Sequence, residues 1–521
     1  MTSARVAIAG GGPVGMTAAL LLAKYGVAST VFEAKPERDP IGSKALCMQR
    51  DVLDILERVG CGRPLVDEGV TWQMGRTYYR DSELFQITFH DAGISAFPPF
   101  VNVGQDRTEF HLERAVDAEP LVEMHYASPV TDVSEDDNGV VITAGSTEPS
   151  RFDYLVGADG ARSTIRSLLG LDFPGRSFTD QFLICDIRAQ LPFENERRFF
   201  FDPEWNPDRQ VLIHPQADSV WRIDWQVPPD YDLDHDQASG GLDERIRKIV
   251  GDQDYEIVWM SVYRFHERIA SAFRAGRSFL AGDAAHIVSP FGARGLNSGV
   301  QDADNVAWKI AFVLNGWADD ALLDTYELER RAAAEENLRV AGTTMEFLVP
   351  QSEEGWEIRR RTLTAAVGNP RAREMVDSGR LAEPYWYTES PLTTIGPHDP
   401  EMMNTPPGTA RPIVPGVLCP DAPCAVPGRA DVGRVRELFG GGFTLLAVGD
   451  PDWAVAAAAG RSEAPVAGFD LEVIEPEGLM RGALQLGDGE AALVRPDGHI
   501  AALELSDPPA VAAAISTALA R

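Results

Sequence analysis

The chain has 521 residues, of which 44% are hydrophobic and 8% aromatic, as in a globular protein with a sizeable core. It carries 79 acidic and 47 basic side chains, which gives a formal net charge of −32 at pH 7. A surface of this sign repels nucleic acids and anionic membranes, so composition excludes both as general partners. The length predicts about two to four domains.

Cysteine usage and the N-terminus set the expected compartment. The cysteines are an odd, sparse set with no His or Cys cluster beside them, which excludes a disulfide framework and predicts no metal site. The apolar run after Arg5 is too short for a signal peptide, and no stretch reaches about 18 apolar residues. We therefore expect a soluble, cytoplasmic protein. The cysteines are Cys47, Cys61, Cys185, Cys419 and Cys424.

A strand, a glycine-rich turn and a helix open the chain. Val6 to Ala9 predict a buried strand, residues 10–15 read GGGPVG, and Met16 to Tyr25 predict an apolar helix. A second strand, residues 28–32, ends at Glu33, so an acid follows the glycines by about 20 residues. This order is typical of a βαβ unit that binds an adenosine dinucleotide.

Each glycine of this turn has its own physical reason. Gly10 permits the tight turn, Gly12 lets a pyrophosphate approach the backbone, and Gly15 lets the helix pack closely on the strand. The helix start offers N–H groups and partial positive charge to the phosphates, while Glu33 accepts hydrogen bonds from the ribose. FAD and NAD both use such a site, so the unit does not distinguish them. The predicted cofactor contacts here also include Pro13, Val14 and Ala34.

Two later segments distinguish these cofactors. Residues 154–166 read YLVGADGARSTIR, a strand that ends in a polar turn. Residues 279–310 read FLAGDAAHIVSPFGARGLNSGVQDADNVAWKI, which predicts a strand, an aspartate, a glycine-rich loop and a helix. An NAD enzyme keeps its cofactor within one contiguous Rossmann domain. Three polar loops separated by long intervals therefore indicate one extended ligand that all three line.

Together the three motifs resemble those of the class A flavoprotein monooxygenases, the aromatic hydroxylase family that includes phenol hydroxylase and 3-(3-hydroxyphenyl)propionate hydroxylase. The turn at 10–15 is similar to the first FAD motif of that family, and GADGARSTIR at 157–166 is similar to its DG motif. GDAAH at 282–286, with the loop up to Asn297, is similar to its GD motif. The resemblance covers about residues 1–400 and implies FAD as the cofactor.

The resemblance implies an α/β fold with three domains. An FAD-binding domain of the Rossmann type, GR2-like, is discontinuous and takes residues 1–180 and 266–400. Residues 181–265 form an inserted substrate domain with an antiparallel sheet, which their alternating apolar and polar runs also favour. Residues 405–521 resemble a thioredoxin-like domain without its CxxC redox motif. Within this last domain the strands are expected at 442–449, 471–476 and 491–503.

The family's GD motif implies how the flavin end of FAD is held. Asp283 is expected to bind a ribityl hydroxyl, and the loop from Pro290 lies against the isoalloxazine ring. Backbone N–H groups of Gly295, Leu296 and Asn297 open a helix, and the positive end of that helix stabilises the negative charge of reduced flavin.

Four more cofactor contacts follow from the resemblance. Asp159 belongs to the DG motif, and Gln105 matches a family Gln ahead of a helix. Many relatives carry an Arg near position 44 that touches the pyrophosphate. Here Lys44 offers a point charge rather than a bidentate fork, and Arg50 is a competing candidate.

The loop before the second helix departs from the family pattern. Many members have a Gly-Gln-Gly type of sequence where this chain has Gly292-Ala293-Arg294-Gly295. Arg294 is therefore a candidate to steady the flavin anion or to hold an acidic substrate, with a solvent-facing side chain as the alternative. Substrate contacts are expected at the loop and the sheet: His214, Trp221, Pro290, Phe291 and Gly292.

No single acid or base can be chosen from the sequence. The catalytic candidates are His214, Tyr263 and Arg294, with His286 as a further histidine. Strand alternation places Trp221 on one face of the sheet and Arg222 with Asp224 on the other, where they read as a plain surface pair.

The resemblance also implies a reaction. NADH or NADPH reduces FAD, O2 forms a C4a-hydroperoxyflavin, and a small phenolic or related aromatic substrate is hydroxylated. Three alternatives stay open at this stage: Baeyer–Villiger or epoxidising oxygenation of an aromatic polyketide, a simple FAD oxidase, and a flavin-binding module without catalysis. A homodimer is common in the family and is a candidate assembly, but the sequence does not decide the oligomeric state.

Overall fold

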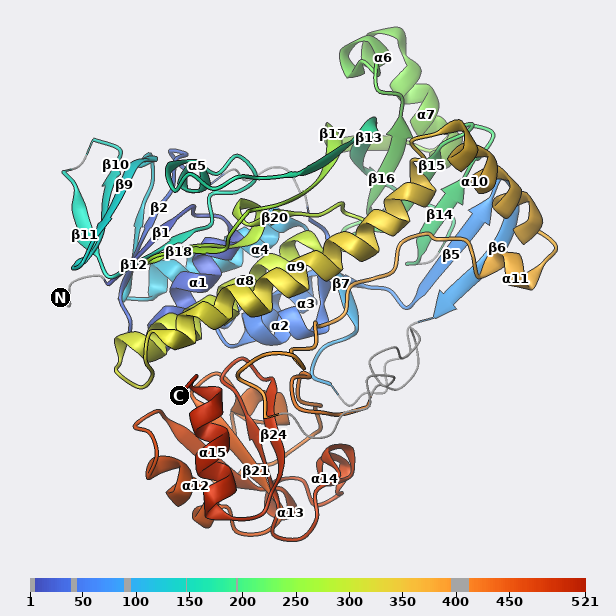
Figure 1. Cartoon of the computed structure of the whole chain (residues 1–521). Coiled ribbons are helices and arrows are strands. Elements are labelled where there is room, and N and C mark those ends of the chain that lie inside the picture. Colours follow the sequence, from blue (N-terminus) through green and yellow to red (C-terminus); the bar gives the residue numbers. More distant parts are fainter. Residues whose placement is uncertain (1–4, 39–44, 89–94, 147, 194, 395–411) are drawn as a thin grey trace.

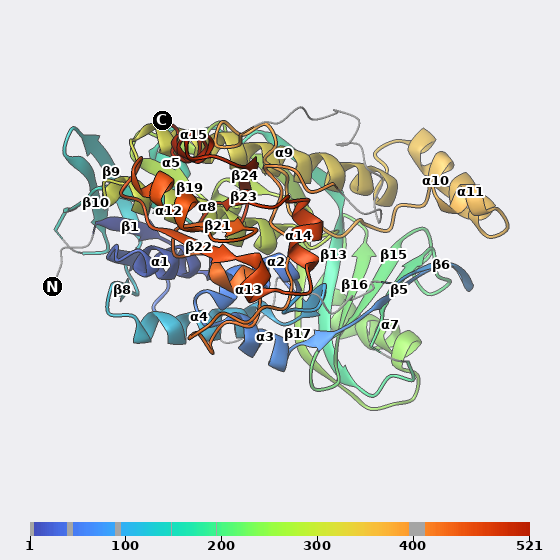
Figure 2. The same cartoon turned by 90° about the horizontal axis from the view of Figure 1, so that it is seen from below.

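A computed structural model describes residues 5–38, 45–88, 95–146, 148–193, 195–394 and 412–521. Figure 1 shows the N-terminal and central segments interleaved in one large body, with the C-terminal segment, in red, forming a smaller body beneath it. Figure 2 shows the same smaller body packed across the helices of the large one.

The first domain is built on a six-stranded sheet with strand order β18-β19-β12-β1-β2-β8. Its strands pair in parallel except for the edge pair β18–β19, which is antiparallel. Every residue of the central strands is buried, because other elements of the domain cover both faces of the sheet. The strands are β1 (Val6–Ala9), β2 (Ser29–Phe32), β8 (Val122–His125), β12 (Tyr154–Gly157), β18 (Arg274–Ala275) and β19 (Ser278–Leu280).

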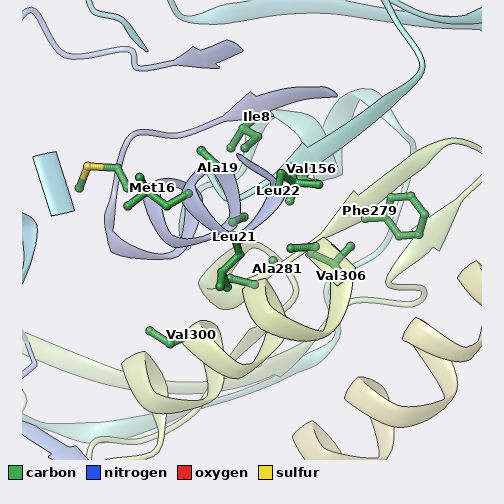
Figure 3. Close-up of a cluster of buried hydrophobic side chains, with 14 of the residues drawn as sticks. Ile8, Met16, Ala19, Leu21, Leu22, Val156, Phe279, Ala281, Val300 and Val306 are labelled. Carbon is green, nitrogen blue, oxygen red and sulfur yellow. The ribbon is translucent and has the colours of Figure 1, made fainter. Parts of the chain in front are cut away.

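Two helices from distant parts of the chain pack against each other in this domain. They are α1 (Pro13–Lys24) and α8 (Gly295–Leu314), and each begins at a glycine-rich motif. A Cβ added to Gly299 would lie 2.7 Å from Cγ2 of Val14, so a glycine permits this close approach. Figure 3 shows the buried cluster that β1, α1 and α8 share, with Ile8, Leu21 and Val306 in it.

Smaller elements complete the first domain. The sheet β3-β7-β4 lies beside the large body's centre, and β11-β10-β9 forms an outer sheet. Their bounds are β3 (Cys47–Gln49), β4 (Val70–Thr71), β7 (Phe100–Asn102), β9 (Val130–Asp136), β10 (Gly139–Ala144), β11 (Ser150–Phe152), α2 (Arg50–Glu57), α3 (Gly62–Glu68), α4 (Gln105–Ala118), α5 (Thr164–Leu168) and the 3-10 turn η1 (Gly282–Ala284).

The second domain is an eight-stranded sheet with order β20-β17-β13-β16-β15-β14-β5-β6. It is wider than the range 181–265 expected from the sequence, because β5 and β6 come from residues assigned to the first domain. It is also not wholly antiparallel, since β14 pairs with β5 in parallel. The strands are β5 (Met74–Tyr79), β6 (Ser82–Thr88), β13 (Gly175–Ala189), β14 (Arg197–Phe201), β15 (Gln210–Pro215), β16 (Val220–Val227), β17 (Tyr255–Ile269) and β20 (His286–Ile287).

The two faces of this sheet have different partners. Helices α6 (Leu233–Ser239) and α7 (Gly241–Val250) cover the face that carries Trp221, Ile223 and Trp225. The other face turns toward the first domain, and α9 (Ala321–Leu348) with α10 (Glu353–Ala366) closes one end of it through a phenylalanine-rich cluster. The short α11 (Pro370–Arg373) follows.

The C-terminal domain has a four-stranded sheet with order β22-β21-β23-β24. A parallel βαβ unit is followed by an antiparallel hairpin and a helix, which is the arrangement of a thioredoxin-like fold. The strand expected at 471–476 is wrong: the strand precedes it and Asp470 caps a short helix there. The elements are η3 (Val435–Leu438), β21 (Phe443–Ala447), α12 (Asp452–Ala459), β22 (Val466–Asp470), α13 (Leu471–Ile474), α14 (Leu479–Leu484), β23 (Ala491–Val494), β24 (Ile500–Leu505) and α15 (Pro508–Ala518).

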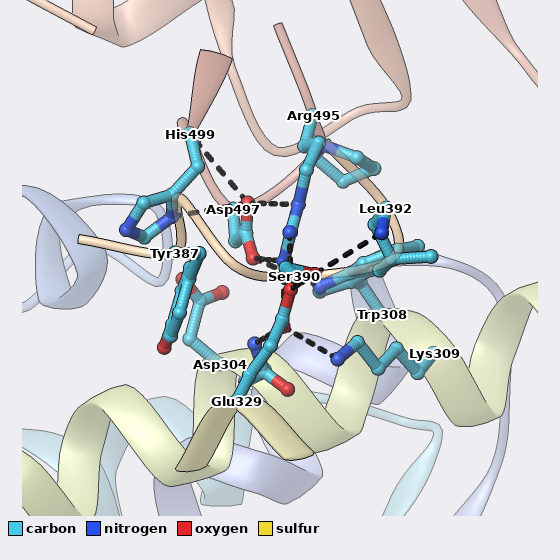
Figure 4. A network of polar contacts seen from close by, with 12 residues as sticks. Asp304, Trp308, Lys309, Glu329, Tyr387, Ser390, Leu392, Arg495, Asp497 and His499 are labelled. Atoms are coloured by element: carbon cyan, nitrogen blue, oxygen red, sulfur yellow. Dashed lines mark hydrogen bonds and ion pairs between the residues drawn. The ribbon is translucent and has the colours of Figure 1, made fainter. Parts of the chain in front are cut away.

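Apolar and ionic contacts dock the C-terminal domain on the first. Trp308 and Phe312 of α8 belong to the same buried cluster as Phe443 of β21. Figure 4 shows Arg495 reaching the carboxylate of Glu329 on α9, with N–O distances of 2.5 and 2.9 Å. Among the described residues no helix is long and apolar enough to cross a membrane, and no group of side chains could hold a metal ion.

Candidate functional site

The glycine turn at the end of β1 has the geometry that the sequence predicts. Gly10 has φ +105°, and a Cβ there would lie 2.4 Å from the carbonyl oxygen of Ala158. A Cβ on Gly15 would lie 2.0 Å from the carbonyl oxygen of Gly10. A Cβ on Gly12 would meet nothing within 4 Å, so open space lies at the start of α1. No side chain of the described residues caps this helix start, which leaves backbone N–H groups for an anion.

Glu33 lies beside this turn at the end of β2. Its Oε2 accepts a hydrogen bond from the N–H of Gly11 at 2.7 Å, and its Oε1 accepts one from the N–H of Lys35 at 2.8 Å. The carboxylate is partly exposed, and the neighbouring Ala34 is exposed. These positions suit a ribose contact, which stays a prediction.

The DG motif joins the other two motifs. The carboxylate of Asp159 caps α5: it accepts hydrogen bonds from the N–H of Thr164 at 2.7 Å and of Ile165 at 3.0 Å. Arg166 donates to the carbonyl oxygen of Ala284 at 2.8 Å, which ties this segment to the GD motif. Asp159 therefore has a structural task here, and its contact with a cofactor stays a prediction.

The GD motif exposes one aspartate and buries a histidine. Asp283 is exposed between the buried Gly282 and Ala284. The Nε2 of His286 lies 2.8 Å from Oδ2 of Asp302, and both side chains are fully buried. His286 is thus engaged inside the first domain, and the structure does not bring it to the face of the large sheet.

The start of α8 is held against β3 by one side chain. Nδ2 of Asn297 donates to the carbonyl oxygen of Cys47 at 2.8 Å, and its Oδ1 accepts from the N–H of Gln49 at 3.0 Å. Within the part of the chain that the structure describes, no side chain caps α8, and Gly295 and Leu296 are only partly buried. A second bare helix start is therefore fixed in place, as the predicted flavin contact requires.

Arg294 does not reach toward the large sheet. Its Nη1 donates to Oδ1 of Asn337 on α9 at 2.6 Å, and its Nη2 donates to the carbonyl oxygen of Arg380 at 3.2 Å. The side chain is buried, which lowers its pKa to about 10, so the solvent-facing alternative is wrong. In the same loop Pro290 is exposed, whereas Phe291 and Gly292 are buried.

The remaining predicted cofactor contacts are dispersed. Lys44 lies outside the described residues. Nε of Arg50 donates to the carbonyl oxygen of Phe97 at 2.7 Å. Oε1 of Gln105 accepts from the N–H of Ala45 at 3.3 Å. Both side chains border β3, and their contact with a pyrophosphate stays a prediction.

The face of the large sheet that turns toward the first domain carries buried charge. Arg222 on β16 donates two hydrogen bonds to Asp186 on β13, each 2.8 Å long. Both side chains are buried, so the surface pair expected from the sequence is wrong. Trp221 lies on the opposite face, where its ring packs edge-on against Phe193 at 5.0 Å, so the structure does not bring it to the site.

Three more polar side chains share the face of Arg222. His214 pairs with Arg222 across β15 and β16, and Asp224 follows Arg222 by two residues. Phe199 of β14 pairs with Leu212 on this face, so Arg197, two residues earlier, lies on it as well. The guanidinium of Arg197 donates to the carbonyl oxygen of Ser378 at 2.6 Å.

These three groups have altered protonation equilibria. Burial and two nearby arginines hold the pKa of His214 well below its usual range, so the ring is neutral. Burial raises the pKa of Asp224 to about 7. Burial lowers the pKa of Arg197 to about 10. Oδ1 of Asp224 and Nδ1 of His214 are buried with no hydrogen-bond partner in the described structure.

The α8 loop and β3 lie opposite this face. The ring of Trp72 meets that of His214 at 6.3 Å, and Trp72 clusters with Cys47, Ala293 and Phe100. Phe291 contacts aromatic rings of the sheet at 5.6 to 6.3 Å. Tyr263 is at the outer end of the same face, 40% exposed and within the electrostatic reach of Asp283.

Sequence reasoning missed Asp224, Arg197, Trp72 and Gln49 as site residues. Asp224 was named there only as a surface residue. The side-chain amide of Gln49 is buried with neither its oxygen nor its nitrogen bonded in the described structure. The available signal was a run of charged residues inside the strand VWRIDWQV, which a solvent-facing strand explains equally well.

A family model described as an FAD binding domain matches residues 3–341, more than half of the chain. The chain belongs to the FAD binding domain family. The bare helix starts at α1 and α8 and the open space at Gly12 fit FAD, the cofactor of this family. The predicted recognition and FAD as the cofactor are thereby confirmed, and the solved structures described below confirm the fold class.

Two relatives match most of the chain. A 3-(3-hydroxy-phenyl)propionate/3-hydroxycinnamic acid hydroxylase of Paraburkholderia xenovorans (strain LB400) is 31% identical over 365 residues, 68% of this chain and 57% of the relative. The 6-hydroxy-3-succinoylpyridine 3-monooxygenase HspB of Pseudomonas putida (strain DSM 28022 / S16) is 32% identical over 340 residues, 63% of this chain and 84% of the relative. The match with the first relative thus spans little more than half of that protein.

Solved structures share the whole fold. The flavin-dependent monooxygenase PieE, in complex with FAD and substrate, has a TM-score of 0.82 at 23% identity and is covered to 99%, as is this chain. Aklavinone-11 hydroxylase, in complex with FAD and aklavinone, has a TM-score of 0.77 at 24% identity, with 100% of this chain and 99% of that chain covered. At these identities the likeness shows the fold alone.

Proposed function

We propose that the protein is an FAD-dependent monooxygenase that consumes NADH or NADPH and hydroxylates a phenolic or related aromatic substrate. The observation that carries this proposal is the combination of two helix starts without a side-chain cap, at α1 and α8, with a sheet face beyond the α8 loop that carries buried polar atoms. By their names, the two relatives described above act on a hydroxyphenyl acid and on a hydroxypyridine, which supports the same class of substrate.

Different residues of the chain would hold different parts of the cofactor. Bound FAD, once reduced by NAD(P)H, would supply the activation of dioxygen for transfer of one oxygen atom to the ring. The N–H groups at the start of α1 would hold the pyrophosphate, and Glu33 would accept from the ribose. The N–H groups at the start of α8 would stabilise the negative charge of the reduced ring system.

An aromatic layer would keep water from the reacting atoms. Phe182 stacks on Phe265 with ring centroids 4.3 Å apart, and Phe291 from the α8 loop packs against both at 5.6 and 5.9 Å. A dry site favours oxygen transfer to substrate over loss of the activated oxygen as hydrogen peroxide.

The test measures where the electrons of NADH or NADPH go. The purified, FAD-loaded protein is given NADH or NADPH with a panel of phenols, while cofactor oxidation, product and hydrogen peroxide are measured together. Substrate-stimulated oxidation with hydroxylated product and little peroxide is expected. Oxidation that yields peroxide alone under every phenol would identify an oxidase, and no oxidation at all would contradict an NAD(P)H-dependent enzyme.

A homodimer, which rests on the family resemblance, and a cytoplasmic location, which rests on the N-terminal sequence, belong to the same proposal. Light scattering on the eluting protein is expected to give about twice the chain mass of 56.8 kDa. A single-chain mass would contradict the dimer without touching the proposed chemistry.

A further inference from the structure

Two unpartnered polar atoms lie on neighbouring strands of the large sheet. Asp224 on β16 and His214 on β15 are diagonal neighbours on one face, since Asp224 pairs with Leu212 and His214 pairs with Arg222. Cα atoms in such diagonal positions lie about 7–8 Å apart, within reach of one small polar group between the side chains. Oδ1 of Asp224 and Nδ1 of His214 are both buried without a partner in the described structure.

The charged side chains near Asp224 make hydrogen bonds with other groups. Arg222, two residues before Asp224 on β16, donates two hydrogen bonds to Asp186 of β13. Arg197 of β14 donates to the carbonyl oxygen of Ser378 and contributes only at a distance. On the other side, Ser261 of β17 and Ile184 of β13 follow across the sheet and carry no charge. The carboxyl of Asp224 is therefore left with unused hydrogen-bonding capacity.

A buried polar atom without a partner is costly, so two adjacent ones indicate a ligand group that satisfies both. A phenolic hydroxyl fits, because it donates one hydrogen bond and accepts others. A carboxylate would accept its proton, and a neutral imidazole can donate to its oxygen. His214 is neutral, and the ring of Trp72 beside it belongs to the cluster that contains Ala293 of the α8 loop.

We propose that Asp224 is the catalytic base that takes the hydroxyl proton of the substrate, with His214 hydrogen-bonded to the same oxygen. The inference rests on the proposed monooxygenase function and deepens it. The O–H bond of the phenol breaks, an O–H bond forms on Asp224, and the electron pair stays on the oxygen as a phenolate. The phenolate is the more electron-rich ring for oxygen transfer. The ring carbon that receives the oxygen atom then gives up its hydrogen as a proton to a water molecule, Asp224 returns its own proton to the phenol oxygen, and the ring regains aromaticity.

The pH dependence has a definite sign. Because burial raises the pKa of Asp224 to about 7, the group is protonated and inactive below that pH and ionised above it. The value of kcat/KM for a weakly acidic phenol should therefore rise with pH through about 7. Arg222 and Arg197 oppose the upward shift of this pKa, while Asp186 adds to it.

The first test replaces the base by an amide of the same shape. Asp224→Asn should lower kcat/KM for weakly acidic phenols by about a hundredfold or more, the range for loss of a general base. Nitrophenols, which ionise without help at neutral pH, should lose far less. Asp54→Asn is the matched control, because Asp54 is also a partly buried carboxyl with its pKa raised to about 6 but pairs with Arg436 at the domain interface. If Asp224→Asn keeps the acid limb, or if Asp54→Asn abolishes it, Asp224 is not the base.

The second test needs no turnover. A nitrophenol is titrated into FAD-loaded protein without NAD(P)H, and the absorption of its anion reports the pKa of the bound hydroxyl. The wild type should bind the anion with a proton taken up by the protein, and Asp224→Asn should change that uptake. Equal ionisation curves in both proteins would overturn the inference. A wild type with no phenol-stimulated NAD(P)H oxidation, but with this difference in binding, would instead count against the proposed function alone.

Discussion

Glycine is required at positions 10 and 12 for opposite reasons. Gly10 is in the left-handed region with its missing side chain pressed on the carbonyl of Ala158, whereas Gly12 has φ −76° and faces open space. A side chain at Gly10 would conflict with the protein itself. A side chain at Gly12 would conflict only with a ligand.

The variants should separate accordingly. Gly12→Ala should leave the unfolding temperature of the FAD-free protein unchanged and weaken FAD binding by roughly tenfold or more, since about 1.4 kcal/mol corresponds to each tenfold. Gly10→Ala should destabilise even the FAD-free protein by about 1–3 kcal/mol. Flavin titration and thermal unfolding check both, and a stable Gly10→Ala protein with normal FAD affinity would contradict the geometry.

A second residue-scale prediction concerns the buried pair on the sheet. Arg222→Met should cost about 3–5 kcal/mol, because it leaves the Asp186 carboxylate buried without its cation. Arg188→Ala is the control on the same strand as Asp186, where an exposed pair with Glu256 should contribute at most about 1 kcal/mol. Urea unfolding measures the difference, and equal losses would contradict the burial.

At the scale of elements, the start of α8 depends on its tether to β3. Asn297→Ala would leave the carbonyl of Cys47 and the N–H of Gln49 without their bonds, at about 1–3 kcal/mol each. The expected result is weaker FAD binding and a larger share of peroxide per NAD(P)H consumed. Asn315→Ala, at the exposed far end of the same helix, is the control and should leave the peroxide share unchanged. If Asn297→Ala leaves the peroxide share unchanged, the hydrogen bonds of Asn297 to β3 do not affect the chemistry at the flavin.

The elements also show how far the sequence reaches. The strand–turn–helix unit at β1 and α1 is predictable, because its glycines and apolar runs act within about 30 residues. The recruitment of β5 and β6 to the large sheet is not, because it depends on pairing with β14 far along the chain. For the same reason Asp224 could not be identified from the sequence: alternation gives its face, but only the folded structure shows that this face is at least partly buried.

On the scale of the whole molecule, the C-terminal domain and the flavin-binding domain share one buried ionic network. Glu329 on α9 accepts from Arg495 of the C-terminal domain and from Lys309 on α8 at 2.7 Å (Figure 4). Arg495 also donates to Asp497 at 2.5 Å. One guanidinium therefore links two carboxylates across the interface, close to the helix that opens the flavin site.

The acid stability of the protein should depend on that guanidinium. Arg495 holds the pKa values of Glu329 and Asp497 well below their usual range in the folded state. The unfolded chain binds more protons than the folded one, so this stability is fully present above about pH 4.3 and is lost as pH falls below it. Arg495→Met removes the cause of the low pKa values. It should cost about 3–5 kcal/mol at pH 7, where it strands buried carboxylates, and should flatten the loss of stability between about pH 5 and 3.

Denaturant unfolding across that pH range checks this prediction. Arg339→Ala, which removes an exposed pair on α9, is the control and should keep the wild-type slope. A parallel drop of wild type and Arg495→Met with acid would mean that other carboxylates dominate acid unfolding. A flatter stability curve for Arg495→Met would show that the carboxylates at the domain interface dominate acid unfolding. The thioredoxin-like domain would then act as a structural brace for α8 and α9, through charge and apolar packing rather than through cysteine chemistry.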